Sequence, residues 1–350
     1  MFKVKVLTGL VCVTFLAVII QGCSNDTPVN PAASTDIDYN AAYVVNGEGN
    51  SISVIDIATN QVKKTISLGS MMWPHHINLN AAKTKIAIGI PGIDLSGAHG
   101  IHGEHEGMFA VLDAKTGNIL GSKSLANINH NAIFSADGSE IWTAVAHTLG
   151  MVYVYNSDNL TLKDSIAVGN NPLEVTLSSD GSMVFVANNL SNNVTAINVA
   201  SKTTMATIPV GVSPIAAWTG SDNKMYVDNE SGQTLSIIDV VSMLVEETVS
   251  LGFKPGMAAY NSHLNELWVT NETNGTVVYF QRMGSVWMNM GSIATGNGAH
   301  ALTFSNNGMT AYVTNQFNGN VSVLNTTAKT KITDIPVGIK PNGLMLRYIN

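Results

Sequence analysis

Histidine is the residue type with the clearest capacity for chemistry in this chain of 350 residues, which contains nine of them. Imidazole nitrogen is a ligand that both zinc and copper accept in proteins. Seven of the nine fall in or near two kinds of position, and we take these seven as candidate metal ligands. They are His75, His76, His99, His102, His105, His130 and His300.

The first kind of position is set by the repeats described below. His75, His130 and His300 take the same place in three different repeats, at the start of the strand that we expect to line a central channel. In the next place along, different repeats hold His76, Asn131 and Glu174. Three imidazoles with a carboxylate nearby can form a first coordination shell for copper or zinc. The alternative is that a histidine opening a buried strand only donates a hydrogen bond to a carbonyl.

The second kind of position is a loop over residues 92–107. It holds His99, His102 and His105 at three-residue spacing, interleaved with Glu104 and Glu106. The loop is an insertion of about a dozen residues relative to the usual repeat period. We expect it to lie on the face of the molecule where the channel-lining strands begin, where it can fold over the histidines. The alternative is a solvated, glycine-rich loop, because no ligand spacing here is diagnostic.

These side chains must be positioned by a repeated strand of the form aromatic-Val-x-Asn. The copies recur at intervals of 41 to 55 residues, with two degenerate copies at residues 87–90 and 142–145. The five clear copies are Tyr43-Val44-Val45-Asn46, Phe185-Val186-Ala187-Asn188, Tyr226-Val227-Asp228-Asn229, Trp268-Val269-Thr270-Asn271 and Tyr312-Val313-Thr314-Asn315. A fixed period in this range predicts stacked supersecondary units. We expect the aromatic residues to pack between units and each Asn to satisfy backbone groups at its strand end.

Each unit contains three further strand patterns. A second alternating strand follows the first, a third ends in glycine, and a fourth opens shortly afterwards, in several units at a proline. Pro209 and Pro336 place the third strand at a sheet edge, because proline cannot donate to a ladder. Four antiparallel strands repeated radially predict an all-β, seven-bladed β-propeller. The strand at residues 342–347 is expected to complete the N-terminal blade and close the ring.

The repeats resemble the YVTN family of β-propellers, which occurs in bacterial and archaeal surface and periplasmic proteins. Tyr312-Val313-Thr314-Asn315 reproduces the family signature, and the resemblance covers roughly residues 40–350. The absence of a Trp-Asp dipeptide and a Gly-Gly pair makes WD40 and kelch repeats poorer matches. The resemblance implies the fold and an address at the cell envelope. It implies no activity, because propellers carry many unrelated functions.

The N-terminus predicts export and lipid attachment. Lys3 and Lys5 precede an apolar run that is too short to span a membrane and typical of a secretory signal. Gly22-Cys23 resembles a bacterial lipobox, with a plain signal peptide or an uncleaved anchor as the alternatives. We therefore expect a signal peptide at 1–22, lipidated Cys23 with a flexible tether at 23–36, and the propeller at 37–350. By analogy with bacterial lipoproteins, Ser24 favours the outer membrane, facing either the periplasm or the exterior.

Composition excludes several functions. The only other cysteine, Cys12, lies in the predicted signal, which leaves the mature domain without disulfides, thiolate nucleophiles or cysteine-bound metals. The chain has 24 acidic and 17 basic residues and a net charge of −7, so it lacks the basic surface that nucleic acid requires. No nucleophile elbow, phosphate-binding loop or complete calcium loop is present.

Two hypotheses about function remain, and they differ in class. The first is a lipid-anchored envelope propeller that binds or scaffolds a protein or glycan partner. The alternative is a histidine-ligated metal protein, either a copper carrier or a copper oxidoreductase, with its site at the channel mouth. Hydrolase or lactonase activity is possible for propellers in general, but no residue pattern in the sequence supports it.

Overall fold

The computed structural model describes residues 1–3, 35–96 and 105–349. The chain divides into two compact units, Met1–Thr35 and Asp36–Asn350. The predicted signal from residue 4 onward, Cys23, most of the tether, His99 and His102 lie outside the described residues. Within the described ranges, no helix has the length and apolar character needed to cross a bilayer.

The described part of the second unit consists of seven four-stranded antiparallel sheets, each with its strands in the same radial order. The inner strands are β4 (Ile77–Leu79), β8 (Ile133–Phe134), β12 (Pro172–Leu177), β16 (Pro214–Thr219), β20 (Pro255–Asn261), β24 (Ala299–Phe304) and β28 (Pro341–Arg347). The second strands are β1 (Ala41–Asn46), β5 (Lys85–Ile90), β9 (Glu140–Val145), β13 (Met183–Asn188), β17 (Lys224–Asn229), β21 (Glu266–Asn271) and β25 (Thr310–Asn315).

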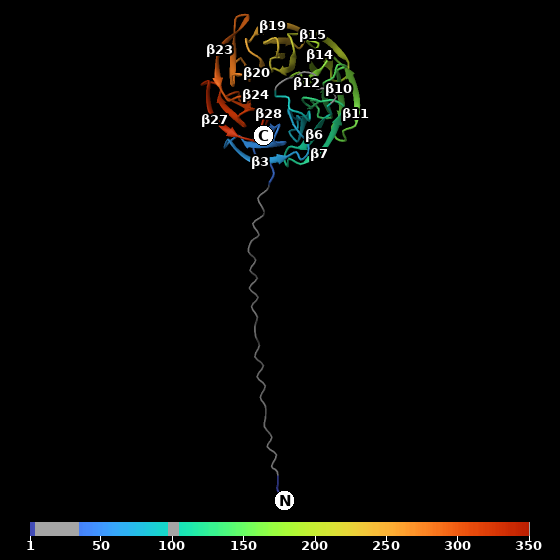
Figure 1. The fold of residues 1–350 in the computed structure, drawn as a ribbon, viewed down its shortest axis with the longest axis vertical. Helices are drawn as coiled ribbons and strands as arrows, with labels where there is room; N and C mark the ends of the chain where they lie inside the picture. The colour runs from blue at the N-terminus through green and yellow to red at the C-terminus, as the bar shows by residue number, and fades with distance from the viewer. Residues whose placement is uncertain (4–34, 97–104, 350) are drawn as a thin grey trace. The chain divides into compact units, whose positions relative to one another are not determined.

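Counted outward from the axis, the third strands are β2 (Ser51–Asp56), β6 (Gly107–Asp113), β10 (Met151–Asn156), β14 (Asn193–Asn198), β18 (Thr234–Asp239), β22 (Thr276–Met283) and β26 (Asn320–Asn325). The outer strands are β3 (Gln61–Ser67), β7 (Ile119–Leu125), β11 (Leu162–Ala167), β15 (Thr204–Pro209), β19 (Leu244–Ser250), β23 (Val286–Ala294) and β27 (Thr330–Pro336). Figure 1 shows the sheets as blades around one axis, with outer strands such as β3, β11 and β27 at the rim. The seven-bladed, all-β propeller predicted from the sequence is confirmed.

The ring closes through the first and last strands of the propeller. Strand β28 pairs antiparallel with β1, with Tyr43 opposite Met345 and Ala41 opposite Arg347. The predicted completion of the N-terminal blade by the C-terminal strand is therefore confirmed. Pro209 and Pro336 lie in the outer strands β15 and β27, as expected for residues that cannot donate to a neighbouring strand.

Neighbouring blades pack through the repeated aromatic residues, as predicted. Tyr226 on β17 packs with Leu267 of the next blade, and Tyr312 on β25 packs with Val44 beyond the closure. Each of these four side chains is almost fully buried. Burying one large apolar side chain stabilises a fold by roughly 1.5–3 kcal/mol, so this repeated contact is a main source of propeller stability.

The repeated Asn satisfies a backbone group, as predicted, in two of the clear copies: Asn46 Oδ1 accepts from Gly338 N at 3.0 Å, and Asn271 Oδ1 accepts from Asn274 N at 3.1 Å. The side chain also has a role that was not predicted. In four blades its Nδ2 donates mainly to side-chain oxygens of the third strand, as from Asn188 to Thr195 Oγ1 at 2.8 Å, and not to backbone groups. The same side chain fills the space beside the glycine that ends the outer strand of the preceding blade. A Cβ on Gly169 would lie 2.7 Å from Asn188, and one on Gly338 would lie 2.5 Å from Asn46 Cγ. The repeated glycine and asparagine therefore form one contact between blades.

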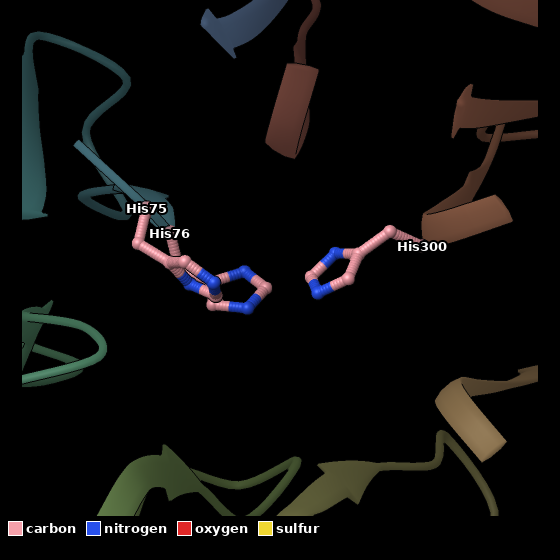
Figure 2. A group of neighbouring side chains, drawn as sticks. All are labelled: His75, His76 and His300. Carbon is pink, nitrogen blue, oxygen red and sulfur yellow. The ribbon is translucent and has the colours of Figure 1, made fainter. Parts of the chain in front are cut away.

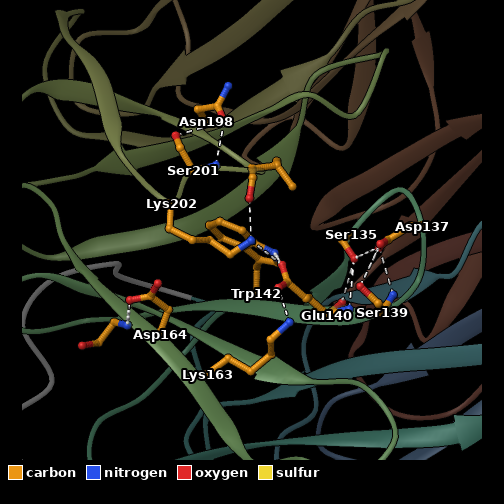
Figure 3. A network of polar contacts seen from close by, with 12 residues as sticks. Ser135, Asp137, Ser139, Glu140, Trp142, Lys163, Asp164, Asn198, Ser201 and Lys202 are labelled. Carbon is orange, nitrogen blue, oxygen red and sulfur yellow. Dashed lines mark hydrogen bonds and ion pairs between the residues drawn. The ribbon is translucent and has the colours of Figure 1, made fainter.

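Two pairs of adjacent blades are also joined by a buried glutamate, which we call the blade latches. Glu140 at the start of β9 accepts hydrogen bonds from Trp142 Nε1 at 3.2 Å and Lys202 Nζ at 2.7 Å, and it also pairs with Lys163 (Figure 3). Burial raises the pKa of Glu140, but the two lysines outweigh it and hold the pKa below its usual range.

The second blade latch repeats the first at equivalent positions. Glu266 at the start of β21 accepts from Trp268 Nε1 at 2.9 Å and pairs with Lys329 of the next blade. The Nζ of Lys329 lies 5.1 Å from the centre of a Trp268 ring, close to the 4.8 Å between Lys202 and Trp142. In both latches the carboxylate has cationic and indole donors, so each is a satisfied polar contact.

Candidate metal centre on the propeller axis

The candidate histidines reach the axis from three blades. His300 is the second residue of β24, whereas His75 and His130 lie just ahead of the short strands β4 and β8. The sequence predicted all three at strand starts, and this is wrong for the latter two. Their segments bond to each other through His76 N, which donates to His130 O at 3.3 Å. His75 N also donates to Gly89 O of the neighbouring strand β5 at 2.9 Å.

Two glycines make this close approach possible. A Cβ on Gly89 would lie 2.5 Å from His130 O, and a Cβ on Gly343 would lie 2.7 Å from His75 O. Both contacts are with backbone atoms, which cannot rotate away as a flexible side chain can. Gly89 belongs to a degenerate copy of the repeat, so the departure from the repeat pattern is what lets the His75–His76 and His130 segments meet.

The side chains of His75, His76, His130 and His300 gather around one point with Glu174 of β12, and we call these five residues the axial cluster. The ring centre of His75 lies 4.4 Å from that of His76, 4.9 Å from that of His130 and 5.4 Å from that of His300. His75, His130 and His300 are buried. Figure 2 shows the rings of His75, His76 and His300 turned toward a common space from opposite sides of the axis.

The axial cluster contains two overlapping sets of possible metal ligands. One is His75, His76 and His300, and the other is His75, His130 and Glu174. Within each set the three ligand atoms lie within 4.8 Å of one another. A small inward movement would bring such atoms to the roughly 2.0–2.2 Å that zinc requires of nitrogen and carboxylate oxygen. The predicted grouping of His75, His76, His130 and His300 is thus present in the structure.

Glu174 is held tightly inside the cluster. Its Oε1 lies 3.0 Å from His76 Nε2 and 3.6 Å from His130 Nδ1, while its Oε2 accepts from Asn131 Nδ2 at 2.9 Å. Asn131 is itself fixed to the backbone of Val175 on both sides of its amide. Burial raises the pKa of Glu174, but the charge of His76 and the hydrogen bonds from His130 and His76 outweigh it and lower that pKa to about 2. The carboxylate is therefore ionised at neutral pH.

A cavity of about 360 Å³ adjoins the cluster. His76, Glu174 and Asn131 line it together with the aromatic side chains Trp218, Tyr260 and Phe304. His75, His130 and His300 are absent from its described lining, so His76 and Glu174 are the members of the cluster that face the cavity. That described lining contains no lysine or arginine. A cavity of this size and character is typical of small-molecule sites.

The described part of the long loop contributes apolar side chains near the axis, whereas the predicted ligands His99 and His102 lie outside the described residues. Ile93 and Leu95 pack with Leu173 and Ile215, which take the same repeat position as His75 in their own blades. Lys340 pairs with Asp94 and donates to Ser96 Oγ at 3.2 Å, which ties this part of the loop to the last blade. The described residues 93–96 of the loop therefore pack where the inner strands of the neighbouring blades begin. His105 is exposed and is not among the described residues that gather at the axis.

Trp218 and Asp228 were not identified from the sequence. The ring of Trp218 lies 5.8 Å from that of His76, centre to centre, and its Nε1 donates to Asp228 Oδ1 at 2.7 Å. Burial, together with the negative charges of Glu174 and Glu230, raises the pKa of Asp228 well above its usual range. The feature of the sequence that could have identified Trp218 is its position on a predicted inner strand. Glu174 has a clearer indication in the sequence, because it shares its repeat position with His76.

The propeller is similar to many solved structures at low sequence identity. One is the periplasmic gluconolactonase PpgL of Pseudomonas aeruginosa, with 16% identity, 89% of this chain and 99% of that chain covered, and a TM-score of 0.69. Another is a Bacteroides fragilis protein provisionally assigned as a 6-phosphogluconolactonase, with 15% identity, coverages of 90% and 99%, and a TM-score of 0.70. The third is Kuenenia stuttgartiensis hydrazine synthase, with 16% identity, coverages of 81% and 92%, and a TM-score of 0.67.

These likenesses establish the fold and nothing finer. No family model matches the chain, and no curated protein matches it. The chain therefore has the fold of a seven-bladed β-propeller, and the structures similar to it include lactonases.

Proposed function

We propose that the protein binds a copper or zinc ion in the axial cluster. The observation that carries the proposal is the convergence of four imidazoles and one ionised carboxylate from four blades onto one point. The nitrogen and oxygen donor set, without sulfur, suits Zn²⁺ and Cu²⁺.

Metal content of the full chain tests this proposal. The protein is purified without a histidine tag, and copper and zinc are measured by elemental analysis before and after reconstitution. We expect stoichiometric metal, a melting temperature that falls on chelation, and loss of the metal when His75, His130 and His300 are changed together to Ala. His147→Ala is the matched control, because His147 accepts a hydrogen bond from Leu149 N and lies outside the described cluster. A protein that stays metal-free after reconstitution would refute the proposal.

Hydrolysis of a lactone is a second candidate, supported by the His76–Glu174 pair in the cavity wall and by the gluconolactonase among the structural neighbours. With Nε2–H donated to Glu174, Nδ1 of His76 is free to remove a proton from water as it attacks the ester carbonyl. The ring oxygen then leaves and takes up that proton. Because no cation lines the described cavity, an unphosphorylated lactone fits better than a phosphorylated one.

Rates of hydrolysis of glucono-δ-lactone and its 6-phosphate test the second candidate, measured on protein with and without metal. We expect activity on the unphosphorylated lactone that falls at least 10²-fold in His76→Ala, as is usual for loss of a general base. Equal activity of the variant, or a preference for the phosphorylated lactone, would exclude this reaction at this site.

The envelope address is a separate proposal. The YVTN-type repeats and the lipobox-like Gly22-Cys23 support a propeller that is lipid-anchored in a bacterial envelope, with the outer membrane favoured by Ser24. A protein or glycan partner at that surface remains compatible with the metal centre. Metabolic labelling with a radioactive fatty acid, lost in Cys23→Ser, tests the anchor, and fractionation of the membranes tests the address.

A further inference from the structure

The two ligand sets of the axial cluster share His75, so an ion bound by one set uses a ligand that the other set needs. They differ in their access to solvent. All three members of the His75–His130–Glu174 set are buried, whereas the His75–His76–His300 set contains the half-buried His76, which lines the cavity. An ion in the first set would be enclosed, as structural zinc is, while an ion in the second would have one side toward the cavity.

The hydrogen bonds of Glu174 favour the second set. Glu174 already accepts from His76 and Asn131, and Asn131 is fixed to the Val175 backbone. To bind an ion itself, Glu174 would have to give up its contact with His76. With the contact kept, Nε2 of His76 is engaged by Glu174, which leaves Nδ1 as the nitrogen that would ligate the ion. A carboxylate that orients a ligating histidine in this way is a common outer partner in metal sites.

We propose that the ion is held by His75, His76 and His300, that Glu174 acts as a positioning residue through His76, and that the open coordination position faces the cavity. This inference rests on the proposed metal centre. It assigns the cavity to a small exogenous molecule that coordinates the ion through an oxygen or nitrogen atom. Three protein ligands with one open position are the arrangement found in catalytic zinc sites, as opposed to closed structural ones.

Azide is a suitable probe for the open position. The described lining of the cavity has no lysine or arginine, so an anion gains little there except by coordinating the metal. For the copper(II) protein we expect azide to produce a saturable charge-transfer absorption band. We also expect the electron paramagnetic resonance spectrum of the azide-free protein to show hyperfine coupling to three nitrogens.

Three variants separate the two sets. Glu174→Gln should lower copper affinity by about 10- to 100-fold, as expected for an outer partner, while the three-nitrogen pattern and azide binding persist. His300→Ala should remove one nitrogen from the pattern and lower affinity at least ten times more than His130→Ala does. Glu140→Gln is the matched control for Glu174→Gln, since it removes a buried carboxylate from a blade latch and should leave copper affinity unchanged.

The opposite result is equally clear. If the enclosed set holds the ion, His130→Ala will cost more affinity than His300→Ala, Glu174→Gln will change the equatorial donor pattern, and azide will give no band. The comparison of His130→Ala with His300→Ala decides between the sets even if Glu174→Gln folds poorly. Copper-free wild-type protein after reconstitution would instead refute the metal centre itself.

Discussion

The axial cluster and the blade latches are both buried polar groups, but they are built differently. In a latch, Glu140 or Glu266 has an indole donor and a lysine from the neighbouring blade, so each carboxylate has a cationic partner inside the contact. In the axial cluster, four imidazoles lie close to one another, and two of them, from His76 and His130, contact the single carboxylate of Glu174. A carboxylate with a cationic partner suits a contact between blades. Several imidazoles with one carboxylate suit the binding of a cation.

The two regions also differ in how they relate to the repeat. The latches occur twice at equivalent positions, so the same local sequence gives the same contact wherever it appears. The axial cluster draws on residues from four blades and exists only because the ring is closed. Its members depend on one another, and we therefore expect changes in it to be less additive than changes in the latches.

The largest expected effect is at Gly89. Gly89→Ala places a methyl group against the His130 carbonyl and should destabilise the protein by about 1–3 kcal/mol, with loss of metal binding as the two histidine segments separate. Chemical denaturation and metal titration measure the two effects. Gly121→Ala is the control in the outer strand of the same blade, where the added Cβ meets mainly the flexible Leu160 side chain. Retention of full metal affinity in Gly89→Ala would show that the cluster does not require this close approach.

Breaking a blade latch should affect stability alone. Glu140→Ala leaves the Trp142 indole and Lys202 without their shared acceptor, which we expect to cost about 1–3 kcal/mol. Glu266→Ala should behave alike, since the second latch has the same construction. Denaturation midpoints measure the loss. Metal affinity that changed along with stability would remove the distinction between the two regions.

A fall in pH should weaken the axial cluster through Glu174. Its pKa is lowered from 4.5 to about 2, so its ionised form contributes stability that is fully present above about pH 4.5 and is lost as the pH falls toward 2. In the metal-free protein, Glu174→Gln should therefore flatten the dependence of unfolding free energy on pH within that window. Denaturation at several pH values from 5 to 2 makes the measurement. An unchanged slope would mean that Glu174 is not held by the surrounding histidines.

The smallest expected effect is at Asp228, where a substitution should stabilise the protein and not destabilise it. Because burial raises the pKa of Asp228, the folded state keeps its proton at pH values where the unfolded state releases it. Stability therefore falls as the pH rises above the ordinary aspartate range, and Asp228→Asn should relieve that cost at pH 7 while still accepting from Trp218. We expect a modest rise in melting temperature at pH 7 and little change near pH 3.5. A lower melting temperature at pH 7 would show that Asp228 is ionised in the folded protein.

The blades, their strand order and the closure of the ring could be predicted from the sequence. Strand alternation, edge prolines such as Pro209, and turn residues are local features that act over a few residues and recur with each repeat. The repeat also placed His75, His130 and His300 at a shared position, which was enough to predict that they would meet. Lipidation of Cys23 and the roles of His99 and His102 remain predictions, because these residues lie outside the described part of the chain.

What only the tertiary structure decided is which groups complete the cluster and which face solvent. The contact of His76 with Glu174 depends on the distance between blades that are far apart in sequence, and Gly89 and Gly343 set the local approach through backbone contacts. The described part of the long loop brings Ile93 and Leu95 to the place where the inner strands of the neighbouring blades begin. Local pattern determines a strand and its register. The position of a side chain on the axis is determined by how the blades pack around the closed ring.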